Sequence, residues 1–149
     1  YIRACPRGRG AGGGGRAQTA VLFTLRGGVD VEGDVLEFLP RIPLESLAAV
    51  RVFFPDPWPK NKQRHRRLFR PDVVTALVDR LQVGGTLHIA TDIEDYARQV
   101  IEVAAGDGRL LGGVVPRPEW RPVTRYERRG LAAGRTPHDL IYERMSRDE

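Results

Sequence analysis

The chain has 149 residues, of which 41% are hydrophobic and 29% charged, so it can form one globular domain with a single core. Its net charge of +5 favours an anionic partner such as a nucleic acid. One cysteine excludes an intrachain disulfide and a cysteine-based metal cluster, and the three histidines lack zinc-ligand spacing, so no metal is expected. The longest apolar stretch is too short to cross a membrane and no leader peptide is recognised, so we expect a cytoplasmic protein.

Residues 1–27 are predicted to be a disordered Gly/Arg-rich segment. Residues 1–18 are almost entirely Gly, Arg and Ala, so they cannot bury enough apolar surface to offset the entropy of ordering. Their glycines are spaced like those of a nucleotide-binding loop, but the flanking strand and helix that such a loop requires are not recognised. The chain begins at Tyr1 rather than at Met, and we therefore expect a fragment.

From residue 28 to residue 149 the pattern alternates between strands and helices, which predicts one α/β domain. The alternation of Val29 and Val31 predicts a strand that ends at Gly33-Asp34 and leads into a short helix over 35–39. The run 50–54 has the β-branched and aromatic composition of a buried strand. It must end there because three prolines follow within five residues.

The middle of the chain predicts a strand–helix–strand unit with a parallel sheet. Apolar spacing predicts a helix over 71–82 that stops at Gly84-Gly85, followed by a strand over 86–90. Because a helix connects the strands, they are expected to be parallel, with a right-handed crossover. Asp92 is expected to cap the next helix, whose predicted buried face is Ile93, Tyr96, Ala97, Val100 and Ile101.

Residues 139–144 predict a last strand, antiparallel and at or near the sheet edge. Asp34, Asp56 and Asp92 each follow a predicted strand. Ligands of open α/β sheets bind outside the carboxyl ends of the strands, so these three carboxylates are candidate site residues. A single Asp in such a place is often only a helix cap or a turn residue, and that alternative stays open for each of them.

Residues 53–60, with the sequence FFPDPWPK, form the most specific motif in the sequence. Its prolines stiffen the backbone around Asp56 and Trp58, so those side chains have rigid neighbours. A Pro-rich turn is the structural alternative, but a turn has no need of Asp, Trp and Lys together.

Two basic stretches, 60–70 and 117–135, are expected to bind nucleic-acid phosphates. The first contains no acidic residue, and a solvated charge run is its alternative explanation. The second surrounds a polar group that could line a base pocket, formed by Thr124, Arg125, Tyr126 and Glu127.

Several of these motifs together resemble the TrmB family of bacterial tRNA guanine-N7 methyltransferases. They are FFPDPWPK followed closely by RHRR, then GTLHIATDIEDYA, then the TRYE segment that continues through Arg128-Arg129-Gly130, and finally DLIYER. The resemblance covers residues 33–144. It implies a Rossmann-like class I methyltransferase fold, of which this chain holds the C-terminal part of the sheet.

The resemblance also implies the reaction and its residues. S-adenosyl-L-methionine would donate a methyl group to N7 of the variable-loop guanosine of tRNA. Asp34 and Asp56 match cofactor-binding positions, and Asp56 also matches the catalytic carboxylate. Substrate-binding positions are matched by Lys60, Asp92, Thr124, Arg125, Tyr126 and Glu127. RNA-contacting positions are matched by Lys62, Gln63, Arg64, His65, Arg66 and Arg67.

The upstream part of the family pattern has no counterpart here. The Gly-rich cofactor loop, with an acidic residue at the end of the strand before it and another at the end of the next strand, cannot be matched to residues 1–32, so the cofactor loop is expected to be missing. A non-catalytic basic RNA-binding module is therefore the alternative function, while a dehydrogenase would need a fingerprint that the sequence lacks. We expect a monomer that binds tRNA and no membrane.

Overall fold

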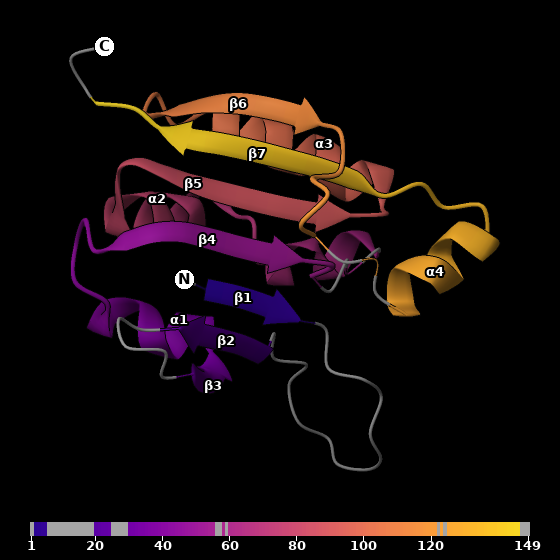
Figure 1. Cartoon of the computed structure of the whole chain (residues 1–149), viewed down its shortest axis with the longest axis horizontal. Coiled ribbons are helices and arrows are strands. Elements are labelled where there is room, and N and C mark those ends of the chain that lie inside the picture. Colours follow the sequence, from indigo (N-terminus) through magenta and orange to yellow (C-terminus); the bar gives the residue numbers. More distant parts are fainter. Residues whose placement is uncertain are drawn as a thin grey trace.

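The computed structural model describes residues 2–5, 20–24, 30–55, 58, 60–121, 123 and 125–146. Within these residues, seven strands form one sheet in the order β3-β2-β1-β4-β5-β7-β6 (Figure 1). The strands are β1 (Ile2–Cys5), β2 (Ala20–Thr24), β3 (Asp30–Asp34), β4 (Leu47–Phe53), β5 (Leu81–Thr91), β6 (Leu110–Val115) and β7 (His138–Arg144). The helices are α1 (Val35–Phe38), α2 (Pro71–Arg80), α3 (Glu94–Ala105) and α4 (Arg125–Ala132), with short 3₁₀ helices η1 (Leu39–Arg41) and η2 (Asn61–Arg66).

The predicted strand–helix–strand unit is confirmed. Strands β4 and β5 are parallel, with Val50 opposite Leu87 and Val52 opposite Ile89, and α2 connects them. Helix α2 ends at Arg80, because β5 already begins at Leu81. The predicted stop signal Gly84-Gly85 instead lies inside β5, where it allows a shift in the register against β4.

Helix α3 forms where expected, with two differences. Its N-cap residue is Ile93, and no side chain caps the helix, so the prediction that Asp92 caps it is wrong. Tyr96, Ala97 and Val100 are buried, whereas Ile101 is 42% exposed. At about 100° per residue, Ile101 points about 140° away from Tyr96 around the helix, and therefore lies beyond the stripe formed by Tyr96, Ala97 and Val100.

The last strand, β7, runs antiparallel to both β5 and β6, which confirms the prediction for the C-terminal segment. Strand β6 was not predicted, because its sequence LLGGVV has neither alternation nor a strong β-forming centre. It is one of the two edge strands of the described sheet, and Leu111 and Val114 are exposed on it.

The amino-terminal segment contains structure that the sequence did not predict. Strands β1 and β2 lie within the segment 1–27 that was expected to be disordered, and their short apolar runs were hidden by the Gly/Arg-rich composition. Residues 1, 6–19 and 25–29 of that segment lie outside the described residues. Strand β2 is antiparallel to both β1 and β3. Because only residues 25–29 separate β2 from β3, no crossover that would make them parallel fits between them.

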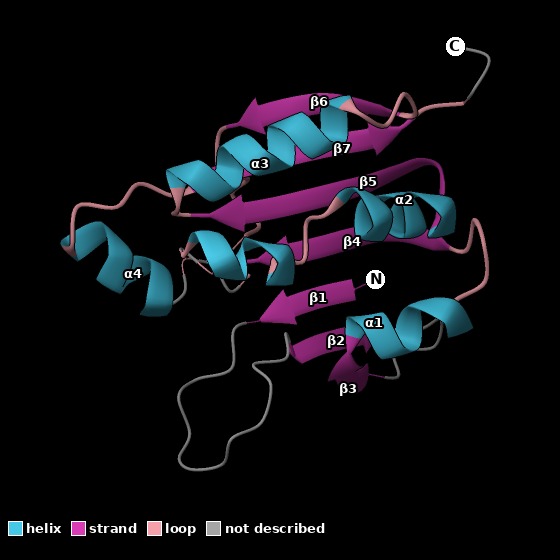
Figure 2. Ribbon diagram, turned by 180° about the vertical axis from the view of Figure 1, so that it is seen from behind, coloured by secondary structure: helices cyan, strands magenta, loops and turns pink. Residues whose placement is uncertain are grey.

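The main core lies between the β4–β5–β7 part of the sheet and helices α2 and α3, which cover the same face (Figure 2). Strand residues such as Val52 and Ile89 pack there against Leu77 and Val78 of α2. Burying each of these side chains contributes about 1.5–3 kcal/mol. The order of the strands, with crossovers through helices between β4, β5 and β6, is that of a Rossmann-like α/β sheet in which two strands, β2 and β7, run antiparallel to their neighbours.

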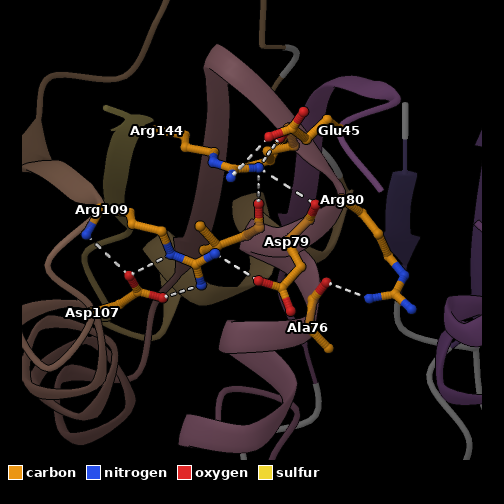
Figure 3. A network of polar contacts seen from close by, with 9 residues as sticks. Glu45, Ala76, Asp79, Arg80, Asp107, Arg109 and Arg144 are labelled. Carbon is orange, nitrogen blue, oxygen red and sulfur yellow. Dashed lines mark hydrogen bonds and ion pairs between the residues drawn. The ribbon is translucent and has the colours of Figure 1, made fainter. Parts of the chain in front are cut away.

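A polar network lies at the edge of the sheet where β5 and β6 begin and β7 ends (Figure 3). Arg144 donates hydrogen bonds to the carbonyls of Val78 and Leu81 at the end of α2. Arg109 bridges Asp79 and Asp107 at 2.6 and 2.9 Å. These arginines satisfy helix-end carbonyls and carboxylates at the edge away from the candidate site.

Candidate functional site

The candidate site lies at the carboxyl edge of the sheet, where β3, β4 and β5 end. Asp34 is the last residue of β3, and Asp92 directly follows β5. Asp56 follows β4 closely in the sequence but lies outside the described residues. Strands β2 and β1 separate β3 from β4, so Asp34 and the end of β4 are about 14 Å apart across the sheet. The strand ends that were predicted to carry Asp34 and Asp92 are confirmed.

The backbone is strained where β4 enters the FFPDPWPK motif. Phe54 has a φ of 52°, a left-handed conformation that non-glycine residues rarely adopt. Its N–H donates a hydrogen bond of 2.7 Å to the carbonyl of Ala90 in β5, and its ring is buried. Trp58 has a φ of 39°, and the guanidinium of Arg66 lies 5.1 Å from its ring centre. Strain of this kind persists only where the surrounding structure holds it, and it is frequent at functional sites.

Asp92 is buried at the end of β5, with only 3% of its side chain exposed. Its Oδ2 accepts a hydrogen bond of 2.8 Å from Nε of Arg135, which follows α4. Gly130 of α4 packs against the same oxygen, since a Cβ atom at that position would lie 2.6 Å from it. The carboxylate therefore sets how closely α4 approaches the end of β5.

A buried cluster joins α4 to β5 and β7 through Arg121. The Nη1 and Nη2 atoms of Arg121 donate to the two carboxylate oxygens of Glu127, at 2.8 and 2.9 Å. Its Nε and Nη2 donate to the two oxygens of Asp139, at 2.8 and 2.9 Å. His88 Nε2 lies 2.7 Å from Asp139 Oδ2, so it completes the chain of contacts. All four side chains are at most 2% exposed.

The electrostatics of this cluster favour the ion pairs. Burial alone would raise the pKa of Asp139, but hydrogen bonds from His88 and Arg121 outweigh burial and lower it. Burial likewise opposes the charge on Arg121, and its bonds to Glu127 and Asp139 overcome this and raise its pKa. Buried charges are tolerated when every partner is in place, and removal of a single partner is strongly destabilising.

Sequence reasoning did not identify Arg121, His88 or Asp139 as site residues. Arg121 was only one of the arginines in the stretch 117–135, and its acidic partner Asp139 is 18 residues away. His88 lies inside a strand, 51 residues before Asp139. The only signal was that Arg121 lies close to the TRYE motif, while His88 and Asp139 lie within the GTLHIATDIEDYA and DLIYER motifs.

The basic run after β4 divides into exposed and buried residues. Lys60 and all but one of the predicted RNA-contacting side chains are exposed or half-buried, namely Lys62, Gln63, Arg64, His65 and Arg66. Arg67 differs, because it is 1% exposed and donates to Gln99 and Asp95 of α3 at 2.7 and 2.8 Å. This geometry favours a role for Arg67 as an anchor of the run on α3 over the predicted contact with RNA.

The group predicted to line a base pocket lies around the start of α4. Arg125 is exposed there, while Thr124 lies outside the described residues and only the backbone of Tyr126 is described. Glu127 is 2% exposed, and Arg121 holds both of its oxygens. This geometry favours an anchoring role for Glu127 over the predicted direct contact with substrate.

In the described part of the chain, no cluster of three or more His, Cys, Asp or Glu residues could hold a metal ion. None of the helices described is long and apolar enough to cross a membrane.

A family model described as "Putative methyltransferase" matches residues 30–140, which include the described ends of β3, β4 and β5, together with η2 and α4. The chain therefore belongs to this methyltransferase family. Two curated relatives share the name tRNA (guanine-N(7)-)-methyltransferase. The one from Nitrosospira multiformis is 44% identical over 118 residues, which is 76% of this chain and 52% of the relative. The one from Nitrosomonas europaea is 48% identical over 105 residues, which is 68% of this chain and 47% of the relative.

These matches confirm the resemblance noted in the sequence and the predicted Rossmann-like methyltransferase fold. The chain spans about half the length of the curated relatives that it matches. Among solved structures, an rRNA methylase from Streptococcus thermophilus is 18% identical, with a TM-score of 0.44 over 74% of this chain and 54% of that one. An O-methyltransferase from Thermotoga maritima is 16% identical, with a TM-score of 0.43 over 78% of this chain and 40% of that one.

Proposed function

We propose that this chain is the substrate-binding part of a tRNA (guanine-N7-)-methyltransferase. The enzyme would transfer a methyl group from S-adenosyl-L-methionine to N7 of the variable-loop guanosine of tRNA. One observation carries the proposal: the end of β4, Asp92 and the start of α4, each within a motif that resembles the family, gather at the carboxyl edge of one sheet. That edge is where open α/β sheets bind ligands.

The cofactor fits this edge only in part. S-adenosyl-L-methionine supplies the methyl group when it is bound. Asp34 at the end of β3 and Asp56 beyond β4 are the acidic residues that we propose to contact it. A Gly-rich cofactor loop, however, leads from a strand into a helix, and here the first described element after the Gly-rich segment is strand β2. We therefore propose that this chain supplies the acidic residues that contact the cofactor. The Gly-rich loop on the other side of the cofactor site is proposed to be absent from it.

The proposed methyl transfer requires a carboxylate that stabilises positive charge, and it requires no general base. Guanine N7 carries a free lone pair at neutral pH, so no proton has to be removed before it attacks a methyl group. The base gains positive charge as N7 is methylated, and a carboxylate beside it stabilises that charge. We propose Asp56 for this role. Asp92 is second, because its buried Oδ2 already pairs with Arg135.

Recognition of tRNA is proposed to divide between the two basic elements. The exposed residues of η2 and Lys60 would contact backbone phosphates, which contribute affinity but no base selectivity. Arg125, Thr124 and Tyr126 would lie nearer to the target base. A monomer suffices for this arrangement.

The experiment compares two tRNA transcripts that carry either guanosine or adenosine at the variable-loop acceptor position. We expect the 149-residue chain to bind the guanosine form about tenfold more tightly, because carboxylates accept hydrogen bonds from guanine N1–H and N2–H, which adenine lacks. The second candidate function, a non-catalytic basic RNA-binding module, is favoured by the exposed cations of η2 and predicts equal affinities. Equal affinities would overturn the proposed base recognition.

A further inference from the structure

Arg121 lies where three separate motifs meet. Its planar guanidinium donates four hydrogen bonds, two to Glu127 of the TRYE segment and two to Asp139 of the DLIYER segment. The same guanidinium lies 5.7 Å from the ring centre of Phe53 and 5.6 Å from that of Phe54, the first two residues of the FFPDPWPK segment. These segments are far apart in the sequence, and Arg121 contacts all of them at once.

The contacts on each side of Arg121 fix a different part of the candidate site. Glu127 lies in the first turn of α4, so a bidentate grip on its carboxylate fixes the start of that helix. Phe54 holds the strained left-handed turn that leads to Asp56, and the guanidinium packs against its ring. Asp139 lies near the start of β7, opposite Ala90 of β5, and this pairing ties the whole cluster to the sheet.

We infer that Arg121 is a positioning residue that sets the spacing between the turn before Asp56 and the start of α4. This inference rests on the proposed function, because it assigns Arg121 the task of holding the two segments that would surround the target guanosine. Arg121 itself is 1% exposed, so we assign it no direct contact with substrate. Lysine cannot replace it, since a single ammonium group cannot bind two carboxylates bidentately and stack on an aromatic ring.

Arg109 provides a matched control at the opposite edge of the sheet. It is also a mostly buried arginine that pairs with two carboxylates, Asp79 and Asp107 (Figure 3). Replacement of either arginine by lysine should lower the melting temperature. Only Arg121→Lys should change the candidate site, and this difference separates positioning from a general structural role.

The first measurement is hydrogen exchange of the folded 149-residue chain and its two variants. In Arg121→Lys we expect the Phe54 amide and the amides of α4 to exchange at least about tenfold faster than in the unchanged chain, because local opening becomes easier. In Arg109→Lys these amides should exchange at the unchanged rate. Unchanged exchange at both places in Arg121→Lys would overturn the inference.

The second measurement repeats the comparison of guanosine- and adenosine-bearing tRNA at a temperature where all variants are folded. Arg121→Lys should lose about tenfold of the preference for guanosine, while its affinity for the adenosine form stays near that of the unchanged chain. Arg109→Lys should keep the preference. A preference that survives in Arg121→Lys would overturn the link to recognition. If the unchanged chain shows no preference, the proposed function fails instead, and the exchange result alone decides whether Arg121 positions the two segments.

Discussion

Gly130 and Asp92 lie so close that a single methyl group would not fit between them. A Cβ atom on Gly130 would be 2.6 Å from Oδ2 of Asp92, whose side chain is only 3% exposed and is held by Arg135. The glycine in α4 and the carboxylate after β5 therefore fix the distance between these two elements. This packing requires a residue that is otherwise unfavourable inside a helix.

Replacement of Gly130 by alanine tests that packing. Alanine would gain about 1 kcal/mol of helix propensity, but the overlap with Asp92 should cost about 1–3 kcal/mol, so we expect net destabilisation or displacement of α4. The control is Gly108→Ala, since a Cβ atom there would meet nothing within 4 Å. Thermal unfolding of both variants measures the difference. If Gly130→Ala were more stable than the unchanged chain, the contact with Asp92 would not restrict α4.

The salt dependence of tRNA affinity tests the exposed part of the basic run. In a double variant, Arg64 and Arg66 are both replaced by glutamine. The slope of log affinity against log salt should then become less steep by about two, one for each lost phosphate contact. Arg41→Gln, an exposed arginine before β4, serves as the control and should leave the slope unchanged. Arg67→Gln should lower stability because Arg67 is buried, with little effect on the slope. If the slope for every variant equalled that of the unchanged chain, the basic run would be a solvated surface that does not contact phosphates.

The cluster around Asp139 predicts a specific loss of stability in acid. Bonds from His88 and Arg121 outweigh burial and lower the pKa of Asp139 in the folded chain, so its ionised form stabilises folding above the unfolded value of about 3.9. That stabilisation is lost as pH falls through the folded pKa. Asp139→Asn should cost about 3 kcal/mol near pH 7, and its deficit should shrink below pH ~4. Urea unfolding across this range measures it, and a deficit that is independent of pH would contradict the ion-pair description.

Binding of S-adenosyl-L-methionine should be weak in the isolated chain. Strand β2, rather than a helix, is the first described element after the Gly-rich segment, so the described residues do not include the helix that normally completes a cofactor loop. Titration calorimetry should therefore detect no binding in the micromolar range. Micromolar affinity would mean that the amino-terminal residues form a cofactor site after all.

The parts of the fold that could be predicted from the sequence are those set by local pattern. The β4–α2–β5 unit and the position of Asp92 follow from apolar periodicity and turn residues over short windows. The role of Arg121 depends on Asp139, 18 residues away, and on side-chain geometry that no local pattern contains. Arg67 likewise looked like one cation in an exposed run, because its partners Asp95 and Gln99 come from another helix.

The proposed reaction is tested most directly in a protein with the full length of a curated relative. In a hybrid, residues 30–149 of this chain replace the matched segment of the Nitrosospira multiformis relative, of which the chain covers 52%. The measurement is the single-turnover rate of methyl transfer to tRNA, at saturating S-adenosyl-L-methionine, for the hybrid and for its Asp56→Asn variant. We expect methylation at N7 of the variable-loop guanosine, and a rate about 10²–10³-fold lower in the variant, with tRNA affinity nearly unchanged. A folded hybrid that binds both molecules yet leaves N7 unmethylated, or a variant that methylates at the hybrid's own rate, would contradict the proposed function of this edge.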